Sequence, residues 1–289
     1  MTFEIIASNL FSGLLLGGIL ALIALGLSIV LGVMRLINLA HGEILVGGAY
    51  LALLLGGATG LDPLLALPLV GLLVAIVALP MQRLLLAPLA GKGAEAPMMT
   101  TFAVSLILQN LFLAWFSADT KSIGETYSIA PFAFGGISVP LIYVLGFAVS
   151  VATILLVYLL VNRTAFGRDL RASALDPIAA ASVGVDVPRV HALTFALGAA
   201  CAAMGGVLIG IVFSFTPSTG ASYLLTSFAV VVLGGMGSIL GTLVAGITLG
   251  LMQSIGALIL GDGFRDLVGL ALFLAVLAVR PGGLLGRRD

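Results

Sequence analysis

Charged residues are scarce in this chain of 289 residues, where Asp, Glu, Lys and Arg together make up only 8%. A soluble globular protein carries about 25% charged residues, so a water-facing surface cannot be built from this composition. The hydrophobic fraction of 61% suits a lipid environment instead. The formal net charge is zero, which provides no basic field for nucleic acid, and we expect no nucleic-acid partner.

Several chemical signatures are also missing from the sequence. Cysteine occurs once, at Cys201, which excludes an internal disulfide and a cysteine-rich metal site. There is no P-loop: Gly91-Lys92 lacks both the upstream glycine and the following Ser or Thr, so we expect the chain to bind no ATP. The patterns of zinc metalloproteases and intramembrane serine proteases are absent as well. We therefore expect no cofactor, no metal and no enzymatic activity in this chain.

Long apolar runs dominate what is present. Charge-free runs cover residues 5–34, 44–61, 63–82, 96–118, 126–162 and 192–261, with a shorter one at 267–279. A helix needs about 20 apolar residues to cross the hydrocarbon. Turn-forming residues divide the longest run at 216–220 and 234–238, and a helix is expected from about Pro140. The sequence predicts one all-α transmembrane bundle of eight to ten spans over residues 1–289, with nine as the working figure.

The basic residues predict an orientation. The N-terminus lacks the basic region of a cleaved signal peptide, so the first run is expected to stay in the membrane. With nine spans and the N-terminus outside, ten of the twelve Lys and Arg residues fall in loops on one side, and only Lys121 and Arg265 fall on the other. Cytoplasmic loops carry the excess of Lys and Arg, so these loops and the C-terminus are predicted to be inside. Segment 222–238 has an alternative: it is short enough to dip into the membrane and return instead of crossing it.

A polar cluster follows the first apolar run, in residues 35–43 (RLINLAHGE). One interpretation is a short cytoplasmic loop. The other is a break between half-helices beside a water-filled cavity, because irregular backbone at membrane depth is tolerated only there or inside the protein. Ionisable residues inside a membrane are functional candidates. Candidate residues of a substrate path are Asn38, His41, Glu43, Gln109 and Asn110, although either amide of the last two could instead join two helices.

The longest inner loop contains a short helix with both ends marked. Asp176 is a good N-cap, Pro177 suits the first helical position, and Gly184 can adopt the left-handed conformation that ends a helix. An incidental loop helix is the simpler interpretation. We favour a helix presented to a cytoplasmic partner, because its exposed side is expected to be apolar. That side comprises Ile178, Ala179, Ala180, Ala181 and Val183.

Three segments, in this order, resemble the branched-chain amino acid ABC transporter permeases. The first is residues 26–43 (GLSIVLGVMRLINLAHGE) with GAY at 48–50. The second is residues 167–184 (GRDLRASALDPIAAASVG). The third is residues 232–242 (VLGGMGSILGT), followed by RPGGLLG at 280–286. The resemblance covers essentially the whole chain.

The resemblance implies a permease subunit of an ATP-driven importer in the bacterial inner membrane, with branched-chain or related amino acids as solute. It implies three kinds of partner: a second similar permease subunit, two cytoplasmic ATPase subunits that bind the ATP, and a periplasmic binding protein. It places the ATPase coupling loop within residues 163–190. The coupling residues are then Arg168, Arg171, Asp176, Pro177, Ala180 and Gly184.

Two alternatives to this function stay open. Urea and short-amide permeases share the same motifs, so the solute follows less directly from the resemblance than the family does. The less favoured alternative is an ion-coupled secondary transporter. It would need protonatable groups deep in the bundle, and only His41 and Glu43 qualify.

Overall fold

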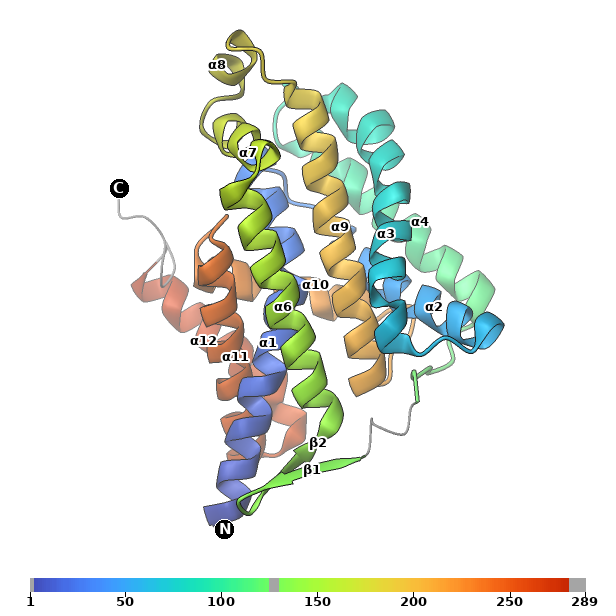
Figure 1. Ribbon diagram of the computed structural model, residues 1–289, viewed down its shortest axis with the longest axis vertical. Helices are drawn as coiled ribbons and strands as arrows, with labels where there is room; N and C mark the ends of the chain where they lie inside the picture. The colour runs from blue at the N-terminus through green and yellow to red at the C-terminus, as the bar shows by residue number, and fades with distance from the viewer. Residues whose placement is uncertain (1–2, 125–129, 281–289) are drawn as a thin grey trace.

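The computed structural model describes residues 3–124 and 130–280, which form a bundle of helices along one long axis (Figure 1). Within the described residues, seven helices are long and apolar enough to cross a membrane. They are α1 (Phe3–Met34), α2 (His41–Thr59), α3 (Pro63–Met81), α4 (Glu95–Phe116), α6 (Leu141–Arg163), α9 (Val187–Val212) and α11 (Ile239–Leu260). One π turn, η1 (Gln82–Leu86), and one 3₁₀ turn, η2 (Ala87–Leu89), extend α3.

Two shorter helices, α10 (Gly220–Gly234) and α12 (Arg265–Val279), have 15 residues each, and η3 (Asp262–Phe264) precedes α12. Together with the seven long helices they agree with the predicted eight to ten spans. The chain is therefore a multi-pass membrane protein of the predicted all-α class. The two predicted divisions of run 192–261 are confirmed, since α9 ends at Val212, before 216–220, and α11 begins at Ile239, after 234–238.

Helix α1 occupies the centre of the bundle, and 94% of its most apolar window is buried. It packs against α9 and α11 over much of its length. Glycines let these backbones approach: a Cβ on Gly26 of α1 would overlap the carbonyl oxygen of Gly198 on α9. Lipid supplies no hydrophobic force between helices, so such close backbone packing is what holds the bundle together.

A β-hairpin lies at the end of the bundle where α1 begins (Figure 1). Strands β1 (Pro131–Phe134) and β2 (Ile137–Pro140) pair antiparallel, and Gly135 and Gly136 form the turn with φ of 58° and 84°. Two positive φ values are the requirement of a tight hairpin turn. The backbone N–H of Ser138 donates to the Ser8 hydroxyl of α1 at 3.1 Å. The sequence did not predict this hairpin, but α6 does begin directly after Pro140, as expected.

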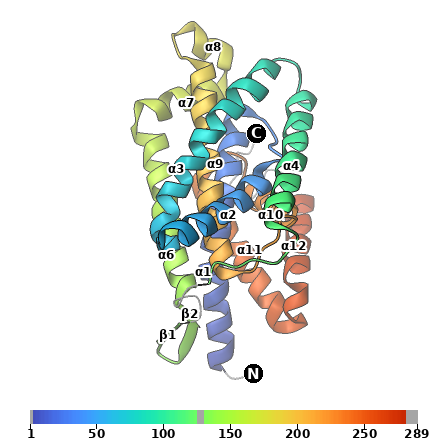
Figure 2. The ribbon, with the colours of Figure 1, turned by 90° about the vertical axis from the view of Figure 1, so that its right-hand side faces the viewer.

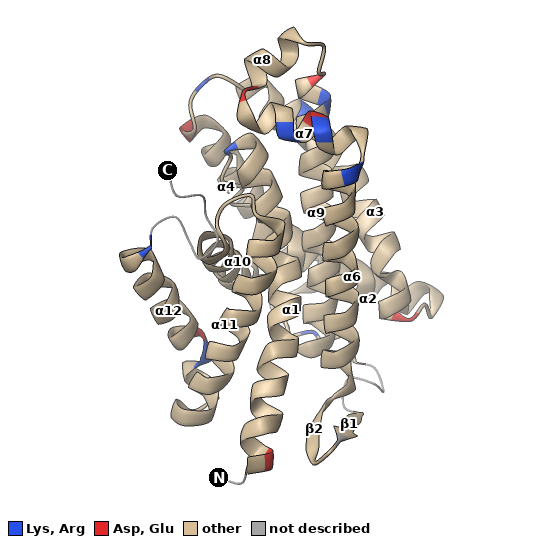
Figure 3. Cartoon of the chain, turned by 60° about the vertical axis from the view of Figure 1, so that its left-hand side comes forward, with Lys and Arg blue, Asp and Glu red and all other residues tan. Residues whose placement is uncertain are grey.

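Two short helices, α7 (Ala165–Leu175) and α8 (Pro177–Ser182), cover the opposite end of the bundle (Figure 2). Basic residues gather around α7 at this end, far from the N-terminus (Figure 3). This separation is the pattern expected from the charge distribution of the sequence. Arg287 and Arg288, which entered that prediction, lie outside the described residues.

Candidate functional site

The connection between α1 and α2 is a break in the middle of the bundle. Residues 35–40 are not helical, and the His41 ring Nε2 lies 2.8 Å from the carbonyl oxygen of Ile23 on α1. Ile23 precedes the last residue of α1, Met34, by 11 residues, or about 16 Å along the helix axis. The chain therefore turns back into the bundle before α2 begins. This geometry supports the half-helix interpretation of 35–43 rather than a simple surface loop.

The three polar residues of the break are buried: Asn38, His41 and Glu43 are 3%, 2% and 3% exposed. The Asn38 side-chain oxygen accepts a hydrogen bond from the Ala40 N–H at 3.1 Å. Thr101 of α4 accepts another from the Leu39 N–H at 3.2 Å. Buried backbone groups require such partners, so these side chains make a non-helical backbone tolerable at this depth.

A second break meets the first. The segment between α9 and α10 is held by Lys121, which follows α4 in the sequence. The Lys121 N–H donates to the Phe215 carbonyl at 2.9 Å, and the Phe215 N–H donates to the Lys121 carbonyl at 2.8 Å. α10 then begins at Gly220, directly against the start of α2. A Cβ on Gly42 would overlap the Gly220 carbonyl oxygen, and a Cβ on Gly220 would lie 2.6 Å from Glu43 Oε1. The first turns of two interrupted helices therefore touch.

Glu43 occupies this junction of helix starts. It lies in the first turn of α2 and its carboxylate packs on Gly220, the first residue of α10. Each helix N-terminus carries roughly half a positive charge, so two of them favour a carboxylate without a basic side chain. Glu43 Oε2 is buried and has no hydrogen-bond partner among the described residues. A buried carboxylate oxygen without a partner is costly, so Glu43 stands out among the polar residues of the break.

The helix at the other candidate site is capped as the sequence predicts. The Asp176 carboxylate accepts hydrogen bonds from the N–H groups of Ile178 and Ala179 at 2.9 and 3.0 Å. Pro177 is the first residue of α8, and Gly184 has a φ of 92°. Asp186 caps α9 in the same way, accepting from the Arg189 N–H at 3.1 Å. Two short-range caps thus fix where α8 and α9 begin.

The expectation that Ala180 lies on the exposed side of α8 is wrong. Ala180 is only 4% exposed, whereas Ile178 and Val183 are each 80% exposed. Two residues along a helix correspond to about 200° of rotation, so Ala180 points opposite to Ile178. Its carbonyl also accepts the Val185 N–H at 3.1 Å, which folds the chain back toward α9. The other four side chains of the predicted apolar side are exposed, and Ile178 of α8 and Val183, which caps its end, are the largest of them.

Comparison with known proteins identifies the family. The family described as branched-chain amino acid transport system, permease component, matches residues 9–277. The chain belongs to this permease family. It is 32% identical to the high-affinity branched-chain amino acid transport system permease protein BraD of Pseudomonas aeruginosa, over 97% of this chain and 96% of that protein. It is 30% identical to the corresponding LivH of Escherichia coli, with the same shares covered.

The fold of the permease also has a solved counterpart. PsaBC from Streptococcus pneumoniae, in complex with Fab, superposes with a TM-score of 0.51 and covers 97% of this chain and 94% of its own. The sequence identity is 19%, so this likeness shows the fold alone. The break between α1 and α2 falls within the residues that the family matches.

Two predicted path residues lie apart from the break. Asn110 of the permease is exposed, and its side-chain amide donates to the carbonyl of Leu106, one turn earlier in α4, at 2.7 Å. Gln109 is half-buried on the same helix. Asn110 follows Thr101 by nine residues, or about 13 Å along the axis. The structure therefore does not bring this pair to Asn38, His41 and Glu43, and their role stays a prediction.

Tyr50 is a buried residue near the break that sequence reasoning passed over. Its ring stacks on Phe116 of α4 at 4.1 Å and meets Phe215, after α9, edge-on at 5.0 Å. Tyr50 is 2% exposed, and its hydroxyl has no partner among the described residues. The cluster ties α2 and α4 to the segment that leads into α10. The only signal for it in the sequence was the GAY motif at 48–50.

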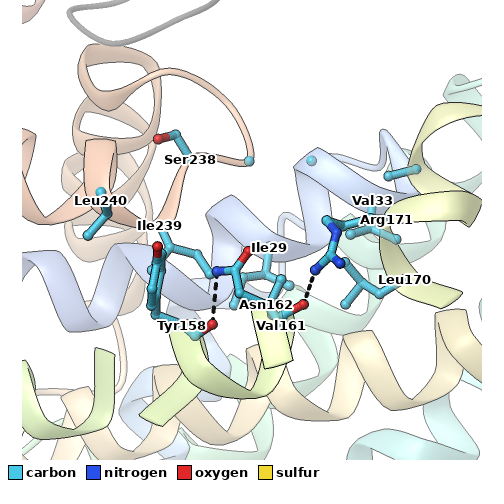
Figure 4. Close-up of a pocket in the computed structure, with 13 residues that line it drawn as sticks. Ile29, Val33, Tyr158, Val161, Asn162, Leu170, Arg171, Ser238, Ile239 and Leu240 are labelled. Atoms are coloured by element: carbon cyan, nitrogen blue, oxygen red, sulfur yellow. Dashed lines mark hydrogen bonds between the residues drawn. The ribbon is translucent and has the colours of Figure 1, made fainter. Parts of the chain in front are cut away.

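A pocket of about 290 Å³ in the permease lies between α7, the ends of α1 and α6, and the start of α11 (Figure 4). Tyr158, Asn162, Arg171 and Ser238 supply its polar lining. Arg171 donates to the carbonyl oxygen of Val161 at the end of α6, and the Asn162 amide donates to that of Tyr158 at 2.9 Å. Arg171 therefore fastens α7 to the end of α6 within this chain.

Proposed function

We propose that this permease is the membrane subunit of an ATP-binding cassette importer that moves branched-chain amino acids across the bacterial inner membrane. The observation that carries the proposal is similarity over 97% of the chain to two permeases named for high-affinity branched-chain amino acid transport. In this proposal residues 1–289 form one permease domain that catalyses no reaction and needs no cofactor. Two separate ATPase subunits bind and hydrolyse the ATP.

The end carrying α7 and α8 is proposed to face the cytoplasm and to contact the ATPases. Basic residues concentrate there, as they do in cytoplasmic loops (Figure 3). Energy must arrive through a protein contact, because the sequence has no P-loop. The coupling loop is residues 163–190, with Ile178 and Val183 as the apolar contacts and Arg168 on the rim. Exposed apolar side chains on a helix suit a groove in a partner protein.

The other coupling residues act by holding α8 in place. Asp176, Pro177 and Gly184 set the ends of the helix, and the buried Ala180 packs it against its own chain. Arg171 fastens the preceding helix to α6. A helix restrained at both ends moves as a body, so a shift of its ATPase contact reaches the membrane helices α6 and α9.

The meeting point of α2 and α10 is proposed to border the path of the solute. Asn38 and His41 shape the break, and Glu43 presents a buried oxygen without a partner among the described residues. Helices interrupted at mid-membrane are the usual place for transporter sites, because their freed ends are polar. Gln109 and Asn110 of α4 are proposed to contact the solute at another point of the path. A second, similar permease subunit would close the path, and a periplasmic binding protein would deliver the solute at the end that carries the hairpin.

Uptake measurements test this function. The permease is expressed with its neighbouring transport genes in a bacterial strain that lacks branched-chain amino acid importers, and entry of radiolabelled leucine is followed. We expect uptake that stops when ATP is depleted and that excess isoleucine or valine inhibits. Inhibition by excess urea in place of valine would support the amide permeases. Uptake that continues after ATP depletion would support an ion-coupled transporter.

A further inference from the structure

A second polar cavity lies between α1, α10, α11 and the start of α12. It consists of two adjoining pockets of about 350 and 160 Å³, which share Ser222, Thr226, Gln253 and Asp266. Small-molecule sites begin at roughly 300 Å³, so the two pockets together have room for a small ligand. None of the residues discussed above for the break or for α8 lines either pocket.

One basic residue faces this cavity. The Arg265 side chain is 28% exposed, and its Nε is buried without a partner among the described residues. The ion pair with Asp262 is loose, at 3.6 Å, and Asp262 is 90% exposed to the surroundings. Tyr143 of α6 lies beside Arg265, and the Phe213 ring centre lies 6.0 Å from the guanidinium carbon. A guanidinium has five N–H donors, so this one keeps donors free for a planar acid group.

The opposite charge is adjacent. Asp266 lines both pockets, and no ion pair for it occurs in the described part of the chain. Next to it, the Thr226 hydroxyl donates to the Ser222 carbonyl at 3.0 Å, which leaves the hydroxyl oxygen able to accept. A positive and a negative group on successive residues, with hydroxyls between α10 and α12, present the complement of a zwitterion.

The remaining wall is apolar. Leu16 and Leu20 of α1 and the Phe213 ring line the larger pocket and are absent from the lining of the smaller one. Both leucines are 4% exposed, so their side chains are set in the packed bundle. An aliphatic side chain would be removed from water on this wall while the head group stays among the charges.

We propose that this cavity binds the free amino acid during its passage, with Arg265 holding the α-carboxylate and Asp266 the α-ammonium. The apolar wall of Leu16, Leu20 and Phe213 takes the branched side chain. This inference rests on the proposed function and deepens it, because it assigns recognition of the zwitterion to a cavity apart from the break at Glu43. Arg265, which was only an exception to the charge distribution in the sequence, becomes a solute-binding residue.

Thiol protection tests the site without depending on transport. Cys201, the only cysteine, is 2% exposed, so Ser222→Cys adds one reachable thiol inside the cavity. Membranes containing the full chain with this change are treated with a small maleimide, with and without L-leucine. We expect leucine to slow labelling. Leucinamide, which lacks the carboxylate, and 4-methylpentanoate, which lacks the ammonium, should each need about ten-fold higher concentration or more, because each loses a charge-assisted bond.

Charge variants provide the matched comparison. Asp266→Asn and Arg265→Gln should remove most of the protection by leucine. Asp119→Asn makes the same change at a residue that is 73% exposed and lines neither pocket, and it should leave protection in place. The analogues are compared on the unchanged charged pair, so a variant that fails to fold does not decide the result.

The inference is overturned if the thiol introduced by Ser222→Cys cannot be labelled, if leucine gives no protection, or if leucinamide protects as well as leucine. Full protection in a folded Arg265→Gln variant would overturn it as well. Uptake of leucine that stays dependent on ATP in any of these cases would leave the proposed function standing. Absence of leucine uptake, with protection intact, would remove the transport proposal and keep the binding site.

Discussion

Replacing Gly42 with alanine should push apart the two helix starts that meet at the centre of the permease. The new methyl group would overlap the carbonyl oxygen of Gly220 and lie 2.6 Å from its carbonyl carbon. Both of these atoms belong to the backbone of α10, so no side-chain rotation can make room. The start of α2 or of α10 must move instead.

The magnitude follows from comparison with Gly57, near the other end of the same helix. A Cβ on Gly57 meets nothing within 4 Å. Gly57→Ala should therefore be neutral or stabilise by about 0.5–1 kcal/mol, the usual gain of alanine over glycine in a helix. Gly42→Ala carries the same helical gain, offset by overpacking of about 1–3 kcal/mol. The difference in unfolding free energy between the two variants is then about 1–3 kcal/mol, with Gly42→Ala less stable.

Buried Cys201 provides the assay, because a thiol-reactive dye reaches it only when the bundle opens. Each purified variant is heated in detergent with the dye, and the midpoint of the fluorescence rise is recorded. The predicted difference corresponds to roughly 2–10 °C. A Gly42→Ala midpoint equal to or above that of Gly57→Ala would show that α2 and α10 do not touch as described.

Three further outcomes test the remaining assignments. Ile178→Ala should weaken binding of the ATPase subunit about ten-fold or more, since burying this side chain is worth about 1.5–3 kcal/mol. Ile76→Ala, on a membrane helix, is the control. Equal dissociation constants for the two variants would show that α8 is not part of the contact. Glu43→Gln should lower leucine uptake about ten-fold at normal membrane yield, because hydrogen bonds to a charged group are worth about 1.5–3 kcal/mol; wild-type uptake would make Glu43 a packing residue only. A reporter inserted after Gly184 should be active in the cytoplasm and one at Gly135 in the periplasm, and the reverse pattern would invert the orientation.

Local features were predictable because their causes lie within a few residues. The cap of α8 depends on Asp176 accepting from groups two and three residues ahead, and its end on the conformational freedom of Gly184. The same holds for the turns that divide α9, α10 and α11, and for the length of each apolar run. The positions of Lys and Arg in the loops can also be read directly from the sequence. They therefore predicted that basic residues gather at one end of the bundle.

Other features depend on contacts between residues far apart in the chain, and only the tertiary structure decided them. The return of residues 35–40 into the bundle depends on contacts with α1 and α4. The sequence alone favoured neither this return nor a surface loop. The inward face of Ala180 depends on how the chain folds back after α8. The pairing of Arg265 with a cavity formed by α1, α10 and α11 requires all of these helices in place. The sequence of one apolar run does not show which of its faces will contact another helix, because lipid and protein interior are equally apolar. The contacting faces are determined by close packing of the whole bundle.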